Sequence, residues 1–224
     1  DRLIQFKDER KLIKSVPKFV PAGQTTQMVV GADNETDQDV ILMADRHYKE
    51  FTLKRVYCSR YILINPAEQA LPAVGPAPPL LRENRLYQSD WLMRFYGFEA
   101  NEIVNNQHPN LDLEVDPKLS WALRNPEQFP VDINKADYRM ILRVPGIGVR
   151  SAKKIVSARR FGKIHIDQLK RMGVAYNRAQ HFIRCADTPQ FIKDLMPSQI
   201  RHQILQGGQS KYTSQLSPQL GLGF

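Results

Sequence analysis

The chain has 224 residues, of which 42% are hydrophobic and 25% are charged, and its formal net charge is +9 at pH 7. This composition is typical of a globular protein with one large or two small domains. No apolar run reaches the roughly 18 residues of a membrane-spanning helix, so we expect no contact with a membrane. The opening DRLIQFKDER has no secretory signal and no initiator Met, which leaves open that the chain is a fragment.

The two cysteines, Cys58 and Cys185, form neither a metal-binding CxxC pair nor a disulfide framework. Unpaired thiols are typical of a reducing compartment, so we expect a cytoplasmic protein. The five histidines are scattered and form no ligand pair, so we expect no metal site.

The excess positive charge lies in one segment. Between Ala136 and Arg184 there are twelve Lys or Arg and two Asp or Glu, which gives +10. The other residues carry twenty cations and twenty-one anions, a balance of −1. A localised basic surface predicts a polyanionic partner such as nucleic acid, although a solvated basic face would give the same count.

Residues 1–65 read as a strand, a helix and a strand. Thr25–Val30 is rich in β-formers and ends at the turn residue Gly31, and a second strand is expected over residues 55–64. The helix between them is indicated by apolar residues at helical spacing, namely Val40, Ile41, Ala44, Tyr48 and Phe51. We expect the two strands to be parallel. Their open edges would need covering, either by a homodimer or by a repacked N-terminus.

Proline then sets the organisation of the middle of the chain. Residues 66–82 contain five prolines and predict an extended linker. Residues 83–129 read as a helical connector that starts with an amphipathic helix from Glu83 to the helix breaker Gly97. At the other end, residues 187–224 form a tail whose Gly, Ser and Gln content predicts partial disorder.

Residues 130–186 contain an internal repeat. Five residues have counterparts 27 positions later, and the pairs are Leu142 and Leu169, Gly146 and Gly173, Ile147 and Val174, Ala152 and Ala179, and Ile155 and Phe182. Each series predicts a helix, a glycine turn and a second helix in which alanine permits close packing. Asn134 is a good N-cap for the first helix, and Pro145 ends it. The expected fold class is therefore α+β and mostly α, with an all-α tandem hairpin domain after the β-α-β unit.

The first turn, within VPGIGVRSAKKI, predicts a phosphate site. Two glycines at a helix start expose backbone N–H groups that have no intrahelical partner and carry the positive end of the helix dipole. Ile147 is expected to point inward and hold the turn, and the Ser151 hydroxyl is expected to reach the phosphate. The predicted phosphate-binding residues are Gly146, Ile147, Gly148, Val149, Arg150, Ser151, Lys153, Lys154, Gly173 and Arg178. Contacts of this kind go to the DNA backbone and predict binding without sequence preference.

The second turn, RMGV at residues 171–174, lacks the first proline and one glycine of the first turn. A phosphate contact there and a structural role in bracing the first turn are both open.

Longer stretches of the chain carry a resemblance. FPVDINKADYRMILRVPGIG with the turn resembles the signature of helix–hairpin–helix DNA-binding domains, including those of DNA repair proteins. Four further stretches, in chain order, resemble DNA modification/repair radical SAM proteins over roughly residues 17–185: PAGQTTQMVVGADNETD, LKRVYCSRYILIN, WLMRFYGF and NLDLEVDPKLSWALRNPEQFPVDINKADY. The resemblance implies that residues 1–65 are the last strands of a TIM-like radical SAM barrel. It also implies a [4Fe–4S] cluster, S-adenosylmethionine and a uracil-DNA glycosylase-like partner for the full-length family.

This chain departs from that family in its cysteines. The radical chemistry needs a CxxxCxxC loop to hold the cluster, and two distant cysteines cannot form one. We therefore expect no cofactor in this chain and no catalytic activity from the chain alone. Gly31 and Glu35 fall near the cofactor position that the resemblance implies, but a turn glycine and a helix-start acid explain them more simply.

Two rival interpretations remain at the level of sequence. The hairpin domain could dock a protein, such as the glycosylase-like partner, in place of DNA. Alternatively, the chain could be half of a radical SAM enzyme that a separate, cluster-bearing chain completes.

Overall fold

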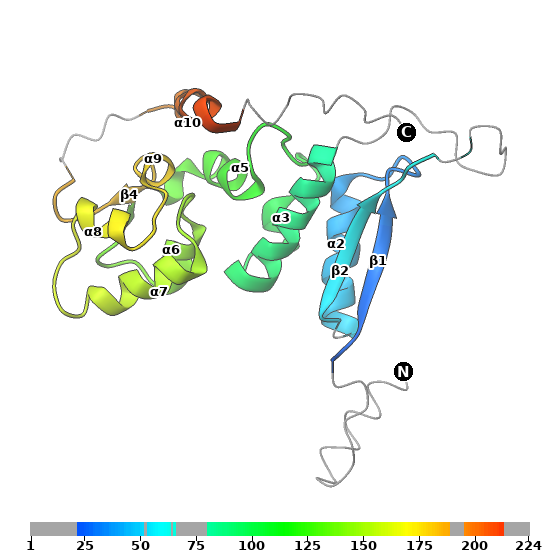
Figure 1. Ribbon diagram of the computed structural model, residues 1–224, viewed down its shortest axis with the longest axis horizontal. Coiled ribbons are helices and arrows are strands. Elements are labelled where there is room, and N and C mark those ends of the chain that lie inside the picture. Colours follow the sequence, from blue (N-terminus) through cyan, green and yellow to red (C-terminus); the bar gives the residue numbers. More distant parts are fainter. Residues whose placement is uncertain (1–21, 52, 64, 66–79, 189–194, 213–224) are drawn as a thin grey trace, which may run out of the picture. The chain divides into compact units, whose positions relative to one another are not determined.

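The computed structural model describes residues 22–51, 53–63, 65, 80–188 and 195–212 (Figure 1). These residues form a mixed α/β structure that is mainly helical and has two small sheets. They divide into two compact units. The first unit contains the residues up to Arg94 and Phe98–Leu113, and the second contains Phe95–Gly97 and the residues from Glu114 onward.

The first unit begins with the predicted β-α-β arrangement. Strand β1 (Thr25–Val30) pairs in parallel with β2 (Arg55–Arg60), and helix α2 (Asp37–Phe51) covers one face of the sheet (Figure 1). The prediction of parallel strands is confirmed, although β2 ends at Arg60 rather than at residue 64. Within the described ranges the sheet has only these two strands, so no closed barrel is present.

Two further helices complete the first unit, α3 (Leu80–Tyr96), whose last two residues belong to the second unit, and α4 (Ala100–Ile103). Helix α3 begins inside the stretch predicted as a linker, and residues 66–79 of that stretch lie outside the described residues. The core is apolar and includes Val30, Val40, Ile41, Val56, Leu86, Leu92 and Ile103.

A buried carboxylate ties the first unit together. Asp37 is 2% exposed and accepts hydrogen bonds from Arg82 Nε at 2.7 Å and from the Leu111 amide at 2.8 Å. One side chain therefore joins the start of α2, the first turn of α3 and the segment after α4. A buried carboxylate needs such partners, because an unpaired charge in the interior is strongly unfavourable.

The second unit is a chain of short elements. Its order is α5 (Pro117–Arg124), η1 (Pro126–Gln128), β3 (Val131–Asp132), α6 (Tyr138–Arg143), α7 (Val149–Ala158), α8 (Ile166–Arg171), α9 (Tyr176–Ala179), β4 (Ile183–Arg184) and α10 (Pro197–Tyr212). The stretch 83–129, read from sequence as one connector, is thus shared between the two units. The middle of the predicted tail, residues 187–224, contains the helix α10, and residues 189–194 and 213–224 lie outside the described residues.

The two copies of the repeat correspond to the helix pairs α6–α7 and α8–α9. Some paired positions share a backbone conformation or a degree of burial. Gly146 and Gly173 have φ angles of 86° and 85°, and the paired alanines, Ala152 and Ala179, are both fully buried. Strands β3 and β4 join the two ends of the repeat, with the Val131 amide donating to the Phe182 carbonyl at 2.8 Å. The domain predicted to be all-α therefore contains a small parallel sheet.

The N-cap of α6 differs from the expectation. Asp137, not Asn134, caps the helix, and its carboxylate accepts from the Met140 amide at 2.7 Å. The Asn134 side chain instead accepts a hydrogen bond from the Ile164 amide at 2.8 Å, 30 residues away. Capping thus moves three residues along the chain, because Asn134 is used to join the two copies of the repeat.

No helix in the part of the chain that the structure describes combines the length and the apolar character needed to cross a membrane.

Candidate nucleic-acid interface

The first turn, residues 144–149, is held from the inside by apolar side chains. Val144 and Ile147 are at most 1% exposed, so both are anchored in the core of the second unit. Between and after them, Gly146 and Gly148 are half-buried, and α7 begins at Val149. The turn therefore presents its backbone, rather than these side chains, to the surface.

Three backbone amides at this turn have no hydrogen-bond partner. Among the described residues, these are the N–H groups of Gly148, Arg150 and Ser151. The Val149 amide bonds to the Tyr96 hydroxyl, and the Ala152 amide bonds to the Gly148 carbonyl at 2.9 Å. Unpaired amides at a helix start carry partial positive charge, which suits a phosphate oxygen.

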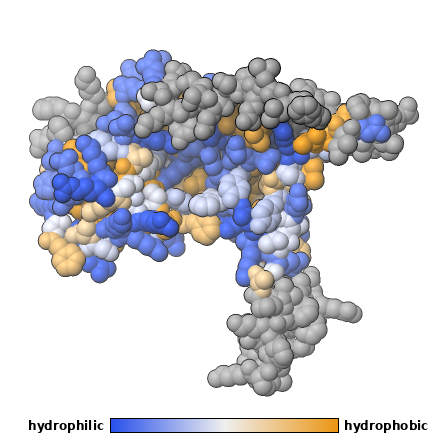
Figure 2. Space-filling model, in the orientation of Figure 1, coloured by the Kyte–Doolittle hydropathy of each residue, from blue (hydrophilic) through white to orange (hydrophobic). Residues whose placement is uncertain are grey.

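Exposed cations follow the turn along one side of α7. Arg150, Lys153 and Lys154 are exposed, whereas Ala152 and Ile155 are completely buried on the opposite side. Hydrophilic side chains dominate the visible face of α7 and α8 (Figure 2). The structure therefore brings the predicted cations and the available amides together at one end of the helix.

The second turn packs directly against the first. The Ala175 amide donates to the Gly146 carbonyl at 2.9 Å, and Gly173 is exposed at the end of α8. Arg178, predicted to bind phosphate, is paired with the carboxylate of Asp116. These contacts favour the bracing role for the second turn.

Ser151 is placed differently from the expectation. Its side chain is buried, and its hydroxyl lies 3.1 Å from the carbonyl oxygens of both Met172 and Gly173. The hydroxyl is therefore used to join the two turns and does not extend from the surface toward a ligand.

Replacing Ser151 by alanine tests this assignment. We expect Ser151→Ala to lower the free energy of unfolding by about 1 kcal/mol, because the hydroxyl no longer donates its proton to the carbonyls of the second turn. DNA affinity should stay within about twofold when the variant is folded, since charge-neutral removal of a side chain that does not face the ligand leaves the electrostatic attraction intact. Urea unfolding and anisotropy titration measure the two quantities, and a large loss of affinity without a loss of stability would return Ser151 to the phosphate site.

Lys118, which the sequence analysis did not single out, lies at the base of the first turn beside Tyr96. Lys118 is 8% exposed, and its Nζ donates to the Ile147 carbonyl at 2.6 Å. The same Nζ lies 4.7 Å from the centre of the Tyr96 ring. Burial lowers the pKa of Lys118 to about 7. No local sequence pattern indicates these contacts, because Tyr96, Lys118 and Ile147 are distant in the sequence and only the fold brings them together.

The chain matches no protein-family model, no curated protein and no solved structure. The resemblance to DNA modification/repair radical SAM proteins therefore stays a prediction, and the functional conclusion rests on the geometry of the first turn.

The weaker cofactor candidates, Gly31 and Glu35, are joined by a hydrogen bond. The Glu35 carboxylate accepts from the Gly31 amide at 2.5 Å and from Arg82 Nη1 at 3.3 Å. These bonds explain both residues as parts of the link between β1 and α3.

The cysteines do not fit an iron–sulfur cluster. Cys58 and Cys185 lie in different units, and two thiols are too few for the three-cysteine loop. Burial raises the pKa of Cys58 to about 11, which favours the neutral thiol over the thiolate that iron requires.

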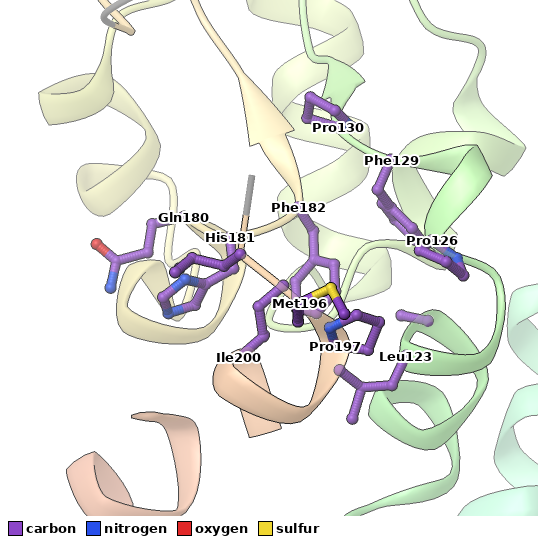
Figure 3. A pocket seen from close by; sticks show the side chains of 12 residues that line it. Leu123, Pro126, Phe129, Pro130, Gln180, His181, Phe182, Met196, Pro197 and Ile200 are labelled. Atoms are coloured by element: carbon purple, nitrogen blue, oxygen red, sulfur yellow. The ribbon is translucent and has the colours of Figure 1, made fainter. Parts of the chain in front are cut away.

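The second unit also has an apolar hollow of about 450 Å³ (Figure 3). The side chains of Phe182, Met196 and Ile200 point toward one another there, and Gln180 and His181 lie at its margin. Its lining comes from α5, the segment after α5, the segment after α9 and the start of α10 with the two residues before it. Such a hollow suits an apolar group and offers little to a phosphate.

Proposed function

We propose that residues 130–186 form a tandem helix–hairpin–helix domain that binds the phosphate backbone of duplex DNA without sequence preference. The observation that carries the proposal is the set of unpartnered amides, those of Gly148, Arg150 and Ser151, at the start of a helix with exposed cations. A phosphate oxygen can approach them closely because Gly148 has no side chain.

The charge of the segment supports a polyanion over a single small anion. The +10 balance between Ala136 and Arg184 exceeds what one bound phosphate would neutralise. Contacts to backbone phosphates supply affinity and position but little sequence information.

We further propose that the chain is the DNA-binding part of a DNA modification/repair radical SAM protein and is inactive by itself. Another polypeptide would then have to bind the [4Fe–4S] cluster and S-adenosylmethionine. Cleavage of S-adenosylmethionine by the purified chain would contradict this part of the proposal.

Salt dependence separates DNA binding from docking of a protein through an apolar surface. If the domain neutralises about three phosphates, the affinity for a 20-base-pair duplex should fall about 40-fold between 50 and 200 mM salt. Fluorescence anisotropy with the duplex, and with a single strand of equal length, measures it. Binding of protein through an apolar surface would change little with salt, and failure to bind either nucleic acid would overturn the proposal.

Single neutralised cations test which side chains take part. We expect Arg150→Gln to weaken binding about equally for duplexes of different sequence and to reduce the salt slope by about one, because one phosphate contact is lost. Lys163→Gln is the matched control, since Lys163 is an exposed cation of the same segment beyond the other end of α7. Equal changes in slope for the two variants would indicate general attraction and no defined contact at the turn.

A further inference from the structure

Lys118 is connected to the proposed phosphate site through a single peptide group. Its Nζ donates to the Ile147 carbonyl, and the N–H of that same peptide belongs to Gly148. A trans peptide is planar, with its C=O and N–H pointing in opposite directions. Holding the carbonyl inward on Lys118 therefore turns the Gly148 N–H outward, toward the position of the phosphate.

Tyr96 completes the arrangement on the inner side. Its ring faces Lys118 Nζ at 4.7 Å, which stabilises a buried cation. Its hydroxyl accepts a hydrogen bond from the Val149 amide, so the amides of Gly148, Arg150 and Ser151 are the ones left without a partner. Burial raises the pKa of Tyr96, so the hydroxyl stays protonated near neutral pH.

Three charged or titratable groups act on Lys118, and a fourth acts on Tyr96. Asp116 at the start of α5 favours the charged form of Lys118, and Arg178 from α9 disfavours it. Tyr96 supplies its ring, and Tyr138 of α6 acts on Tyr96. Desolvation outweighs Asp116 and lowers the pKa of Lys118 to about 7. At neutral pH the side chain is therefore divided between its charged and neutral forms.

We propose that Lys118 is a positioning residue of the phosphate site, which orients the Gly148 amide and takes up a proton when DNA binds. The inference rests on the proposed function. A phosphate on the outer side of the peptide favours the ammonium on the inner side, since charges interact more strongly in a protein interior than in water. The ammonium in turn polarises the peptide and strengthens the N–H as a donor.

The sign of the pH dependence follows from linkage. Below pH 7 Lys118 is charged in the free chain, and affinity is greatest. As the pH rises above the pKa of the free chain, binding requires a proton to be taken up, so affinity falls. It becomes constant again once the pH exceeds the pKa of the complex. If DNA raises that pKa by about one unit, affinity should fall about sixfold from pH 6.5 to pH 8.5.

The experiment compares the wild-type chain with Lys118→Met, which keeps an unbranched apolar side chain of similar length. Both are titrated with a 20-base-pair duplex at pH 6.5, 7.5 and 8.5 and constant ionic strength. We expect the sixfold fall for the wild type and a change within about twofold for the variant, which keeps all five histidines. The variant should also bind more weakly than the wild type at pH 6.5.

The outcomes are distinct. An equal fall in both proteins, or no fall in the wild type, would overturn the role of Lys118 while leaving DNA binding in place. No binding at any pH would overturn the proposed function itself. A second measurement uses the wild-type chain with ¹³C-labelled lysine, in which one Cε signal should titrate near pH 7. Saturating duplex should raise that midpoint by at least about half a unit, and an unmoved midpoint would overturn the inference.

Discussion

Gly148→Glu is expected to weaken binding to a duplex by at least about 30-fold at 100 mM salt, which corresponds to about 2 kcal/mol. The substitution places a carboxylate beside the Gly148 amide, where the phosphate would lie, and like charges repel. The protein should remain folded. Gly148 has a φ of −94°, which any residue adopts, and an added Cβ would meet only the Tyr96 hydroxyl, at 3.7 Å.

Gly162→Glu is the control for this variant. It makes the same change in charge within the same basic segment, beyond the opposite end of α7 from the turn. An added Cβ there has nothing within 4 Å. We expect the control to weaken binding only a few-fold through general electrostatics. Equal losses for the two variants would show that the turn is no special site, and thermal unfolding would show whether either variant has lost its fold.

Elements with a strong local pattern were predictable from the sequence. Thr25–Val30 has the β-branched residues and the closing glycine of a strand, and it forms β1 with those boundaries. The 27-residue spacing of the repeat likewise predicted a turn at each of the two glycines. Both glycines have φ near +85°, which few other residue types tolerate. Local chemistry decides such features, so a single sequence contains them.

Features that depend on distant residues were not predictable. Lys118 reads as a surface cation on a short helix, yet the fold buries it against the first turn, 29 residues further along the chain. Strands β3 and β4 have two residues each and therefore no periodicity to read. From the sequence, the Ser151 hydroxyl is a reasonable hydrogen-bond donor to phosphate. In the fold it lies 3.1 Å from two carbonyl oxygens of the second turn instead. In each case tertiary contact, not local preference, decides the role.

The contact between the two turns has a consequence for stability, which Gly146→Ala tests. An alanine there must adopt a φ of 86°, and its Cβ would lie 2.6 Å from the Ala175 carbonyl oxygen. That oxygen belongs to the backbone, so the second turn has to move away. We expect the free energy of unfolding of the second unit to fall by about 3–4 kcal/mol, with about 1–2 from backbone strain and the rest from the clash.

Gly173→Ala separates these two contributions. Gly173 has nearly the same φ, 85°, but its added Cβ would meet only the Ser151 hydroxyl, at an ordinary 3.6 Å. The strain should therefore be present without the clash, and we expect a loss of about 1–2 kcal/mol. Urea unfolding of the two variants gives the difference directly. If the losses are equal, the turns do not need the close approach, and the second hairpin is not the brace that keeps the first turn's amides in place. Suppose instead that Gly146→Ala lowers the free energy of unfolding by about 2 kcal/mol more than Gly173→Ala and also weakens DNA binding by the folded protein. Gly146 is then needed for the packing of one turn on the other, and this packing supports the phosphate site.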